Sequence, residues 1–416
     1  MKILLFATYP DQATGYARIA CVISNYLASM GHEIYYVGIS NYSGIERFID
    51  PKITLIDALK ERKADSTELY GVDIMVESIE KIKPDIVFIY NDVIVINRIL
   101  NEFINTKMVK NFKLYIYMDL VYDYQKLILF KNINIWSDII FVFSEYWKKN
   151  LLSIGLPQEK IRILPHGVDT DIFYVKDIPN GVGSLPSEVV SLPRQKYGFN
   201  PDDFIILNTN RNSYRKALDI TIDAFIKFLK KQVYNSKIKL FLNTVTNSTR
   251  DYNVTEIIKI VCLKNEADYN QIVMNHIFIR PSDTYLSDDG LNDLYNACDV
   301  GINTCVGEGF GLCNIEHACI GKPQIVSGVG ALTDIFTNEY ATIIKPSAEL
   351  YISEALDFHQ GYIKICSSDD FADAMERYYM DRELAKQHGH RAREVLTSKY
   401  NWSTILNYLN TFFLLE

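Results

Sequence analysis

Two glutamates lie eight positions apart in the glycine-rich segment Gly307–Pro323, GEGFGLCNIEHACIGKP. Glu308 belongs to the predicted loop and Glu316 lies about one turn inside the predicted helix, so the two carboxylates can contact different parts of one elongated ligand. Gly309 lets the backbone approach a ligand closely. The amides at the helix start can point at an anion, namely those of Gly311, Leu312 and Cys313. A carboxylate at this place suits sugar hydroxyls or positive charge on carbon; the simpler alternative is acids that complement the helix dipole.

Basic residues follow the predicted strand Phe204–Thr209, in the sequence NRNSYRKALD. Arg211 and Lys216 are five positions apart and bridge the loop and the next helix, so both can converge on a diphosphate. Arg215 is also available. Cations near the start of a helix are disfavoured by the helix dipole, so their presence indicates an anion that compensates them. The alternative is a basic turn that is simply exposed to solvent.

Two other loops contain candidate ligand-binding residues. The first turn, YPDQATGYAR, lacks G-x-G-x-x-G, which argues against NAD or FAD, but Gly15 can still bring backbone amides to a phosphate or sugar. Asp169-Thr170-Asp171 spells D-x-D, a match too short to predict a metal site. His166 could carry a proton, but a lone histidine in a turn is more often structural. The sequence contains neither a P-loop nor a G-x-S-x-G nucleophile elbow.

The composition is that of a globular protein. The 416 residues are 48% apolar and 23% charged, enough for two or three domains. The formal net charge of −8 argues against a nucleic-acid partner. Seven cysteines without a C-x-x-C pair, and no signal peptide or membrane-length apolar run, predict reduced thiols and a cytoplasmic protein.

Apolar runs that alternate with helical patterns predict the fold class. Runs such as Lys2–Thr8, Glu33–Ile39 and Val300–Asn303 are continuous, as expected for parallel strands buried on both faces. The alternation occurs twice, so we predict an α/β protein with two Rossmann-like, doubly wound domains that face a central cleft. The predicted parts are residues 1–175, a linker rich in proline and glycine at 176–202, and residues 203–399.

These motifs together resemble retaining GT-B glycosyltransferases, specifically the large family 4 group. The E-x7-E pair Glu308 and Glu316 is followed by GKPQIVS. Upstream lie Arg211 and Lys216 at the family's spacing. Further matches, over about residues 1–340, are Leu291, Leu294, Tyr295 and Asp299, the Gly15 loop, Phe143–Glu145, and His166–Asp169 with Phe173.

The resemblance implies transfer of a hexose from a nucleotide diphosphate sugar, with retention at the anomeric carbon and without a metal or other cofactor. Arg211 and Lys216 would stabilise the leaving diphosphate. Glu308 would contact the donor sugar and Glu316 the ribose hydroxyls. The residues expected to line the donor pocket are Phe310, Gly311, Leu312 and Cys313, with Gly15 from the other domain. The helix at 400–416 would pack back on the N-terminal domain.

The sequence predicts the binding partners in less detail than the site residues. The expected partners are a nucleotide-sugar donor, with GDP-mannose preferred, and a glycan or glycolipid acceptor. Many relatives have a histidine where Asp119 follows the strand Lys113–Met118, so Asp119 is the candidate acceptor contact. The basic stretch at Lys107, Lys110 and Lys113 is too sparse to predict peripheral membrane contact. The alternatives are an epimerase or hydrolase on the same fold, or a nucleotide-sugar-binding protein.

Overall fold

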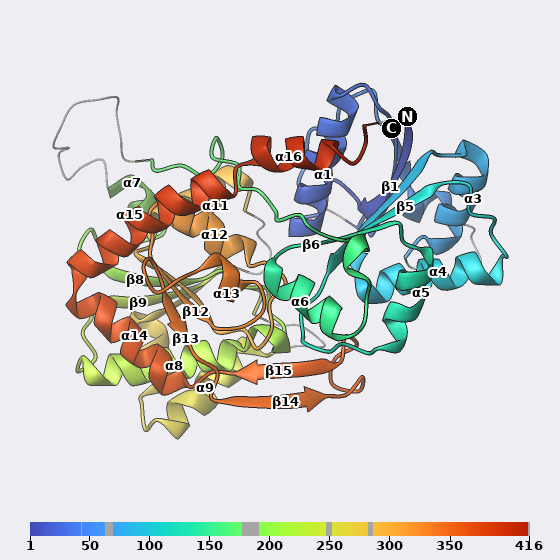
Figure 1. The fold of residues 1–416 in the computed structure, drawn as a ribbon. Coiled ribbons are helices and arrows are strands. Elements are labelled where there is room, and N and C mark those ends of the chain that lie inside the picture. Colours follow the sequence, from blue (N-terminus) through green and yellow to red (C-terminus); the bar gives the residue numbers. More distant parts are fainter. Residues whose placement is uncertain (43, 63–69, 177–190, 247–251, 282–285, 415–416) are drawn as a thin grey trace. The chain divides into compact units, whose positions relative to one another are not determined.

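The computed structural model describes residues 1–42, 44–62, 70–176, 191–246, 252–281 and 286–414 (Figure 1). The chain forms two compact units. The first comprises Met1–His166, Tyr351–Tyr362 and Trp402–Glu416, and the second comprises Gly167–Leu350 and Ile363–Asn401. Each unit holds a parallel sheet with helices packed against it, so the predicted pair of doubly wound α/β domains is confirmed.

The first unit has a seven-stranded parallel sheet in the order β3-β2-β1-β4-β5-β6-β7. The strands are β1 (Lys2–Thr8), β2 (Glu33–Ile39), β3 (Thr54–Asp57), β4 (Ile86–Asp92), β5 (Lys113–Asp119), β6 (Ile139–Val142) and β7 (Ile161–Ile163). The central strands are buried along most of their length, as their continuous apolar runs predict. The chain order reverses between β1 and β4, which is where doubly wound sheets bind ligands.

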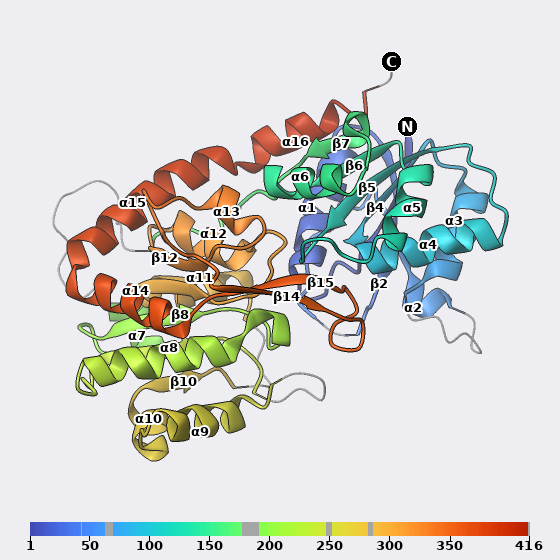
Figure 2. The same ribbon diagram turned by 60° about the horizontal axis from the view of Figure 1, so that its bottom comes forward.

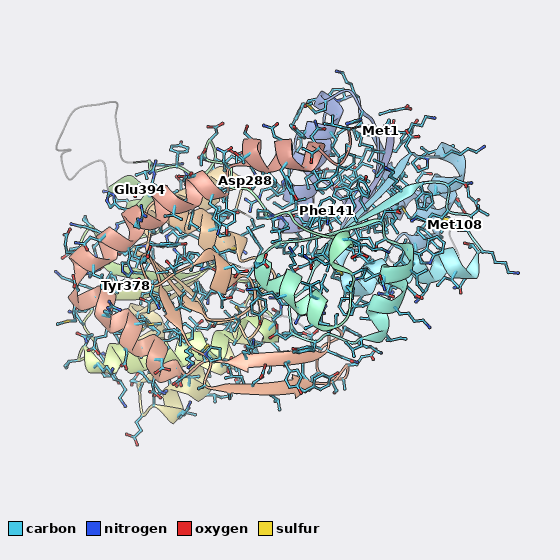
Figure 3. The ribbon with its side chains drawn as sticks, in the orientation of Figure 1. Met1, Met108, Phe141, Asp288, Tyr378 and Glu394 are labelled. Carbon is cyan, nitrogen blue, oxygen red and sulfur yellow. The ribbon has the colours of Figure 1, made fainter. Side chains whose placement is uncertain are left out.

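The helices of the first unit are α1 (Gly15–Ser29), α2 (Ala58–Glu61), α3 (Val72–Ile82), α4 (Val93–Asn105), α5 (Ile128–Trp136), α6 (Glu145–Ser153) and α16 (Trp402–Asn410), with a 3-10 turn at Gln158–Lys160. The C-terminal α16 lies beside α1 (Figure 1). The Tyr115 hydroxyl donates to the carbonyl of Phe412 at 2.9 Å, and the Phe412 ring packs on Phe141, which is fully buried (Figure 3). Buried aromatic contacts thus hold the end of the chain to the first sheet.

The second unit has a six-stranded parallel sheet in the order β10-β9-β8-β11-β12-β13. The strands are β8 (Phe204–Asn208), β9 (Ile238–Leu242), β10 (Ile277–Ile279), β11 (Val300–Asn303), β12 (Gln324–Ser327) and β13 (Thr342–Ile344). The first three strands extend to one side of β8 and the later ones to the other, so the reversal falls between β8 and β11. The carboxyl ends of these two neighbours meet at one edge of the sheet.

The helices of the second unit are α7 (Ser191–Lys196), α8 (Leu218–Lys231), α9 (Val254–Lys264), α10 (Tyr269–Asn275), α11 (Asp288–Ala297), α12 (Leu312–Cys319), α13 (Leu332–Ile335), α14 (Ser368–Met380) and α15 (Arg382–Lys399), with a 3-10 turn at Tyr214–Lys216. Helix α8 packs against α9 and α14 (Figure 2), and α12 packs against α15. Tyr378 of α14 is fully buried in this core (Figure 3). At Gly389 an added Cβ would lie 2.0 Å from the carbonyl oxygen of Gly321, so α15 approaches the end of α12 as closely as glycine allows.

The structure differs from the predicted domain limits in two places. The first unit ends at His166 rather than at 175. Of the predicted linker, residues 177–190 lie outside the described residues, and α7 belongs to the second unit. Its Arg194 is buried, donating to the carbonyl of Asp203 at 2.8 Å and pairing with Asp299 at 2.5 Å. The predicted linker is therefore partly a packed helix.

A two-stranded sheet of β14 (Ala348–Ile352) and β15 (Gly361–Ile365) occupies a stretch for which the sequence pattern predicted no element. Its tip, Tyr351–Tyr362, belongs to the first unit. The amide of Tyr362 donates to the carbonyl of Asp123 at 2.8 Å, and the Tyr122 hydroxyl donates to Asp357 at 2.9 Å. No helix among the described residues is long and apolar enough to cross a membrane.

Candidate active site

The candidate site lies at the carboxyl ends of β8 and β11 in the second unit. The loop after β8 runs to Ala217 and leads into α8, and the loop after β11 runs to Gly311 and leads into α12. Because the strands are parallel neighbours, the two loops meet. The amide of Val306 donates to the carbonyl of Arg215 at 2.9 Å, which joins the loops directly.

At the centre is an ion pair between Lys216 and Glu308, which the sequence places 92 positions apart. Both residues are buried, at 9% and 5% exposure. Arg215 donates to the carbonyl of Gly307 at 2.7 Å and lies 3.5 Å from the second carboxylate oxygen of Glu308. Asn303 donates at 3.3 Å to the carboxylate oxygen of Glu308 that Lys216 also contacts. The glutamate is thus surrounded by donors rather than by a hydrophobic core.

These donors determine the ionisation of Glu308. Burial alone would raise the pKa of a carboxyl group, but the charges of Lys216 and Arg215, with hydrogen bonds from Lys216 and Asn303, lower the pKa of Glu308 to about 2. The group is therefore a carboxylate at any ordinary pH. It can accept hydrogen bonds and stabilise positive charge, but it has no proton to donate.

The backbone after Lys216 is held in an uncommon conformation. Ala217 has φ of +45°, a region that a residue with a Cβ rarely adopts. It ends the 3-10 turn that carries Lys216 and begins α8. The Thr304 hydroxyl, from the loop after β11, donates to the carbonyl of Ala217 at 2.9 Å. This contact between the two loops stabilises the turn that directs Lys216 toward Glu308.

A row of buried amides lies beneath the ion pair. Each donates to the next: Asn210 to Asn303 at 3.1 Å, Asn303 to Asn314 at 2.8 Å, Asn314 to Gln324 at 2.9 Å, and Gln324 to His317 at 3.2 Å. Since His317 Nδ1 accepts from Gln324, its Nε2 carries the proton toward the carbonyl of Tyr295. Burial lowers the pKa of His317 to about 3, which agrees with this neutral form. The buried amide side chains in this row therefore satisfy one another's hydrogen-bonding groups.

Glu316 lies in a separate environment inside α12. It is only 2% exposed, and its carboxylate accepts the hydroxyl of Tyr295 at 2.9 Å. Tyr295 comes from α11 and stacks on His317 with ring centroids 5.1 Å apart. The structure therefore places the two glutamates of the motif in one segment, but only Glu308 joins the cluster of cations.

The start of α12 has the features predicted for close backbone approach. Gly311 has φ of +87°, and an added Cβ would lie 2.6 Å from Leu332. Gly311, Leu312 and Cys313 are all half-buried, whereas Phe310 is buried against the ring of Tyr400, with centroids 5.6 Å apart. Phe310 therefore supports the loop from inside, and the next three residues form its accessible part.

Arg211 stands apart from the ion pair. It is exposed and forms no ion pair with any residue that the structure describes, whereas Arg215 approaches Glu308. The role of Arg211 therefore remains a prediction. Asn303 and Thr304 are site residues that the sequence motifs did not predict. A signal was present, because polar residues directly at the end of a buried strand commonly face the ligand edge of a parallel sheet.

The residues predicted in the first unit lie around the corresponding edge of its sheet. Gly15 begins α1, where the Thr14 side chain accepts the amide of Ala17 at 3.2 Å. Asp119 ends β5 and accepts the hydroxyl of Tyr16 at 2.5 Å. The half-buried Tyr16 has a pKa raised well above its ordinary value by burial and by Asp119, so it remains a donor to this carboxylate.

His166 is a buried structural residue of the first unit. Its Nδ1 lies 2.6 Å from the hydroxyl of Tyr117, which itself donates to the carbonyl of Leu164 at 2.9 Å. Its Nε2 lies 3.3 Å from the hydroxyl of Tyr90. A proton on Nδ1 satisfies all three contacts, because Tyr117 then donates to Leu164 and Tyr90 donates to Nε2. Burial lowers the pKa of His166 to about 3, so the ring stays neutral.

A metal site was not expected from the sequence. Among the residues that the structure describes, no three histidine, cysteine or acidic side chains form a group that could hold a metal ion. The Asp169 carboxylate of the D-x-D triplet accepts the amides of Asp171 at 3.0 Å and Ile172 at 3.3 Å. It serves in a local turn.

Comparison with known proteins places this architecture in a class. Residues 191–395 match the family described as Glycosyl transferases group 1. The chain is 22% identical over 267 residues to the uncharacterized glycosyltransferase MJ1607 of Methanocaldococcus jannaschii, a match that covers 64% of this chain and 57% of that protein. The match to this family thus falls mostly in the second unit.

Solved structures support the same fold over the whole chain. Sucrose-phosphate synthase from Thermosynechococcus elongatus has a TM-score of 0.72 at 17% identity, with 99% of this chain and 98% of that chain covered. Anabaena Alr3699/HepE in complex with UDP and glucose has a TM-score of 0.69 at 13% identity, with 99% of each chain covered. WaaG, a glycosyltransferase involved in lipopolysaccharide biosynthesis, has a TM-score of 0.66 at 13% identity, with 98% of each chain covered. The chain has the GT-B fold.

Proposed function

We propose that the protein is a glycosyltransferase that moves a hexose from a nucleotide diphosphate sugar to a hydroxyl of a glycan or glycolipid, with retention at the anomeric carbon. The observation that carries this proposal is the buried ion pair of Lys216 and Glu308 at the start of α12. It puts a permanent carboxylate and two cations where a parallel sheet binds its ligand.

Glu308 acts on the sugar in this proposal. With a pKa of about 2 it remains charged, so it can accept hydrogen bonds from sugar hydroxyls. It can also stabilise the positive charge that develops at C1 as the bond to the diphosphate breaks. The new C1–O bond forms to the acceptor hydroxyl, whose proton leaves with the nucleoside diphosphate or to solvent.

The leaving diphosphate is stabilised by fixed positive charge and backbone dipoles. Lys216 and Arg215 already contact Glu308, and the exposed Arg211 can approach from the rim of the loop. The first amides of α12, beginning at Gly311, have no acceptor within the helix and suit phosphate oxygens. These groups supply the role that a divalent cation has in other transferases, so no metal is needed.

The remaining predicted contacts complete the proposal. Glu316, oriented by Tyr295, accepts the ribose hydroxyls of the donor, and Gly15 contacts the donor from the first unit. Asp119, held by Tyr16, contacts the acceptor. GDP-mannose is the donor preferred from the sequence, and UDP-glucose is the second candidate, because HepE is described in complex with UDP and with UDP-glucose.

The test measures binding first and turnover second. The purified chain is heated with UDP, GDP, ADP, UDP-glucose or GDP-mannose, and the true donor should raise the melting temperature. Release of nucleoside diphosphate is then followed with and without a panel of alkyl hexosides, and the anomeric configuration of the product is read by NMR. We expect release that depends on the hexoside, and a product with the donor's configuration.

Other outcomes would identify the alternatives. Release without hexoside indicates a hydrolase, and an epimerised sugar indicates an epimerase. Stabilisation without any turnover indicates a binding protein. In the variant Lys216→Ala turnover should fall by about 10²–10³-fold, and unchanged turnover would refute its role at the diphosphate.

A further inference from the structure

The second unit contains a cavity of about 790 Å³ at the opposite end of its strands from Glu308. Its floor includes Phe204 and Val300, the first residues of β8 and β11, and Pro323, which directly precedes β12. Glu308 lies in the loop that follows Asn303, the last residue of β11. Since β8 is five residues long, roughly 16 Å of strand separates this cavity from the carboxyl edge of the sheet.

Helix α15 is the long C-terminal helix of the second unit (Figure 2). Its residues form one wall of the cavity. Beside Ala385, four basic or histidine side chains of α15 line the cavity: Arg382, Lys386, His390 and Arg393. Their spacing of four, four and three positions puts them on one face of the helix. Another face is buried in the core through residues such as His388, Gly389, Ala392 and Leu396. The basic face of α15 is therefore held toward the cavity by packing.

The acids that line the cavity are already engaged. Asp299 pairs with Arg194 at 2.5 Å and accepts the amide of Ile205 at 2.8 Å. Asp202 forms an ion pair with Lys237. The third acid, Asp203, accepts the amide of Asn200 at 2.8 Å. None of these three carboxylates forms an ion pair with a side chain of α15.

The cations of α15 have no such partner. Arg382, Lys386 and Arg393 form no ion pair with a carboxylate in the part of the chain that the structure describes. Arg391, on another face of the same helix, does pair with Glu394, at 3.0 Å. In a chain with a net charge of −8, the basic residues lining this cavity outnumber the three acids, which makes a local excess of positive charge.

One of these cations is also fixed in place. The guanidinium of Arg382 stacks on Phe204, with its carbon 3.8 Å from the ring centroid, and lies 4.9 Å from that of Tyr379. Burial lowers the pKa of Arg382, and the charge of Asp299 opposes this shift without forming an ion pair with the guanidinium among the described residues. A planar guanidinium held in this way is suited to phosphate oxygens.

We propose that this cavity binds a small phosphorylated metabolite, with its phosphate against Arg382, Lys386 and Arg393. The cluster of cations matches the two negative charges of a phosphate monoester, and the volume is that of a small-molecule site. The concave shape favours such a ligand over a macromolecule. Because the cavity is at the other end of the sheet from Glu308, the ligand binds at a second site, independent of the proposed sugar donor.

The test is calorimetric titration of the full chain with glucose 6-phosphate, inorganic phosphate and glucose at low ionic strength. Both phosphates should bind and glucose should not. Tighter binding of the ester assigns the cavity to a phosphorylated sugar or similar metabolite, and equal binding assigns it to phosphate itself. Lys386→Gln and Arg393→Gln should each weaken binding by about tenfold. The matched control Arg391→Gln removes a charge from the same helix outside the cavity and should not.

Three results would overturn the inference: no binding of either phosphate at millimolar concentration, equal weakening by Arg391→Gln, or unchanged binding in both cavity variants. The variant Lys216→Ala separates the two sites. If it abolishes phosphate binding that Arg393→Gln leaves intact, the phosphate occupies the proposed donor site, which supports the proposed function and refutes the second site.

Discussion

Replacing Lys216 with methionine should destabilise the second unit, and adding Glu308→Gln should restore its stability without restoring turnover. Both partners are buried, and removing one of a buried pair leaves a charge that costs about 3–5 kcal/mol. The pKa of Glu308, about 2 against an ordinary 4.5, corresponds to about 3 kcal/mol at 1.36 kcal/mol per pKa unit. Arg215 and Asn303 still contact the carboxylate in the variant, so we expect a loss of about 2–3 kcal/mol.

The same pair makes the effect depend on pH. Folding lowers the pKa of Glu308, so the unfolded chain takes up this proton more readily than the folded chain. The stabilisation is therefore complete above about pH 4.5 and is lost as the pH falls toward 2. The difference in stability between the wild type and Lys216→Met should shrink over that range.

The position of the tryptophans allows the two units to be followed separately. Trp136, Trp147 and Trp402 all belong to the first unit. Their fluorescence during urea unfolding therefore reports the unit that carries no substitution and serves as an internal control. Hydrogen exchange, followed by mass spectrometry in the peptides of β8 and β11, reports the second unit. The single and double variants together form a cycle that isolates the pair energy.

The refuting result is a coupling energy below about 0.5 kcal/mol in this cycle, which is the range of independent sites. It would show that Lys216 and Glu308 are not paired in solution. Equal losses of stability in the two units would instead show that the substitution acts by unfolding the whole chain.

Three further predictions concern other parts of the molecule. Gly311→Ala should cost about 1–3 kcal/mol in the second unit, because φ is +87° and the new Cβ would lie 2.6 Å from Leu332; an unchanged urea midpoint would contradict the geometry. Burial lowers the pKa of His166 to about 3, so the unfolded chain binds this proton more readily and wild-type stability should fall by about 1.4 kcal/mol per pH unit from about pH 6.5 toward pH 3. His166→Gln should flatten this dependence in the fluorescence melting of the first unit, and parallel profiles would count against it. EDTA should leave sugar transfer intact, whereas a loss restored by Mn²⁺ would favour the D-x-D triplet as a metal site.

The sequence predicted much of the secondary structure correctly because burial follows local pattern. Continuous apolar runs gave strand limits that agree residue for residue at Lys2–Thr8, Glu33–Ile39 and Val300–Asn303. The pattern did not predict the hairpin of β14 and β15. Residues Ala348–Tyr351 on β14 are exposed, so no hydrophobic periodicity marks that strand.

The sequence by itself determined which residue types the candidate site contains, because residue type and local spacing are read directly: a glutamate pair in a glycine-rich segment at the start of a helix, and basic residues after a strand. Which groups meet was decided only by the tertiary structure. Adjacent β8 and β11 bring together Lys216 and Glu308, and Arg215 rather than Arg211 reaches the carboxylate. The physical reason is that the order of the strands depends on how the apolar faces of the sheet and of all the helices that cover it are buried together. No single segment of the sequence contains that information.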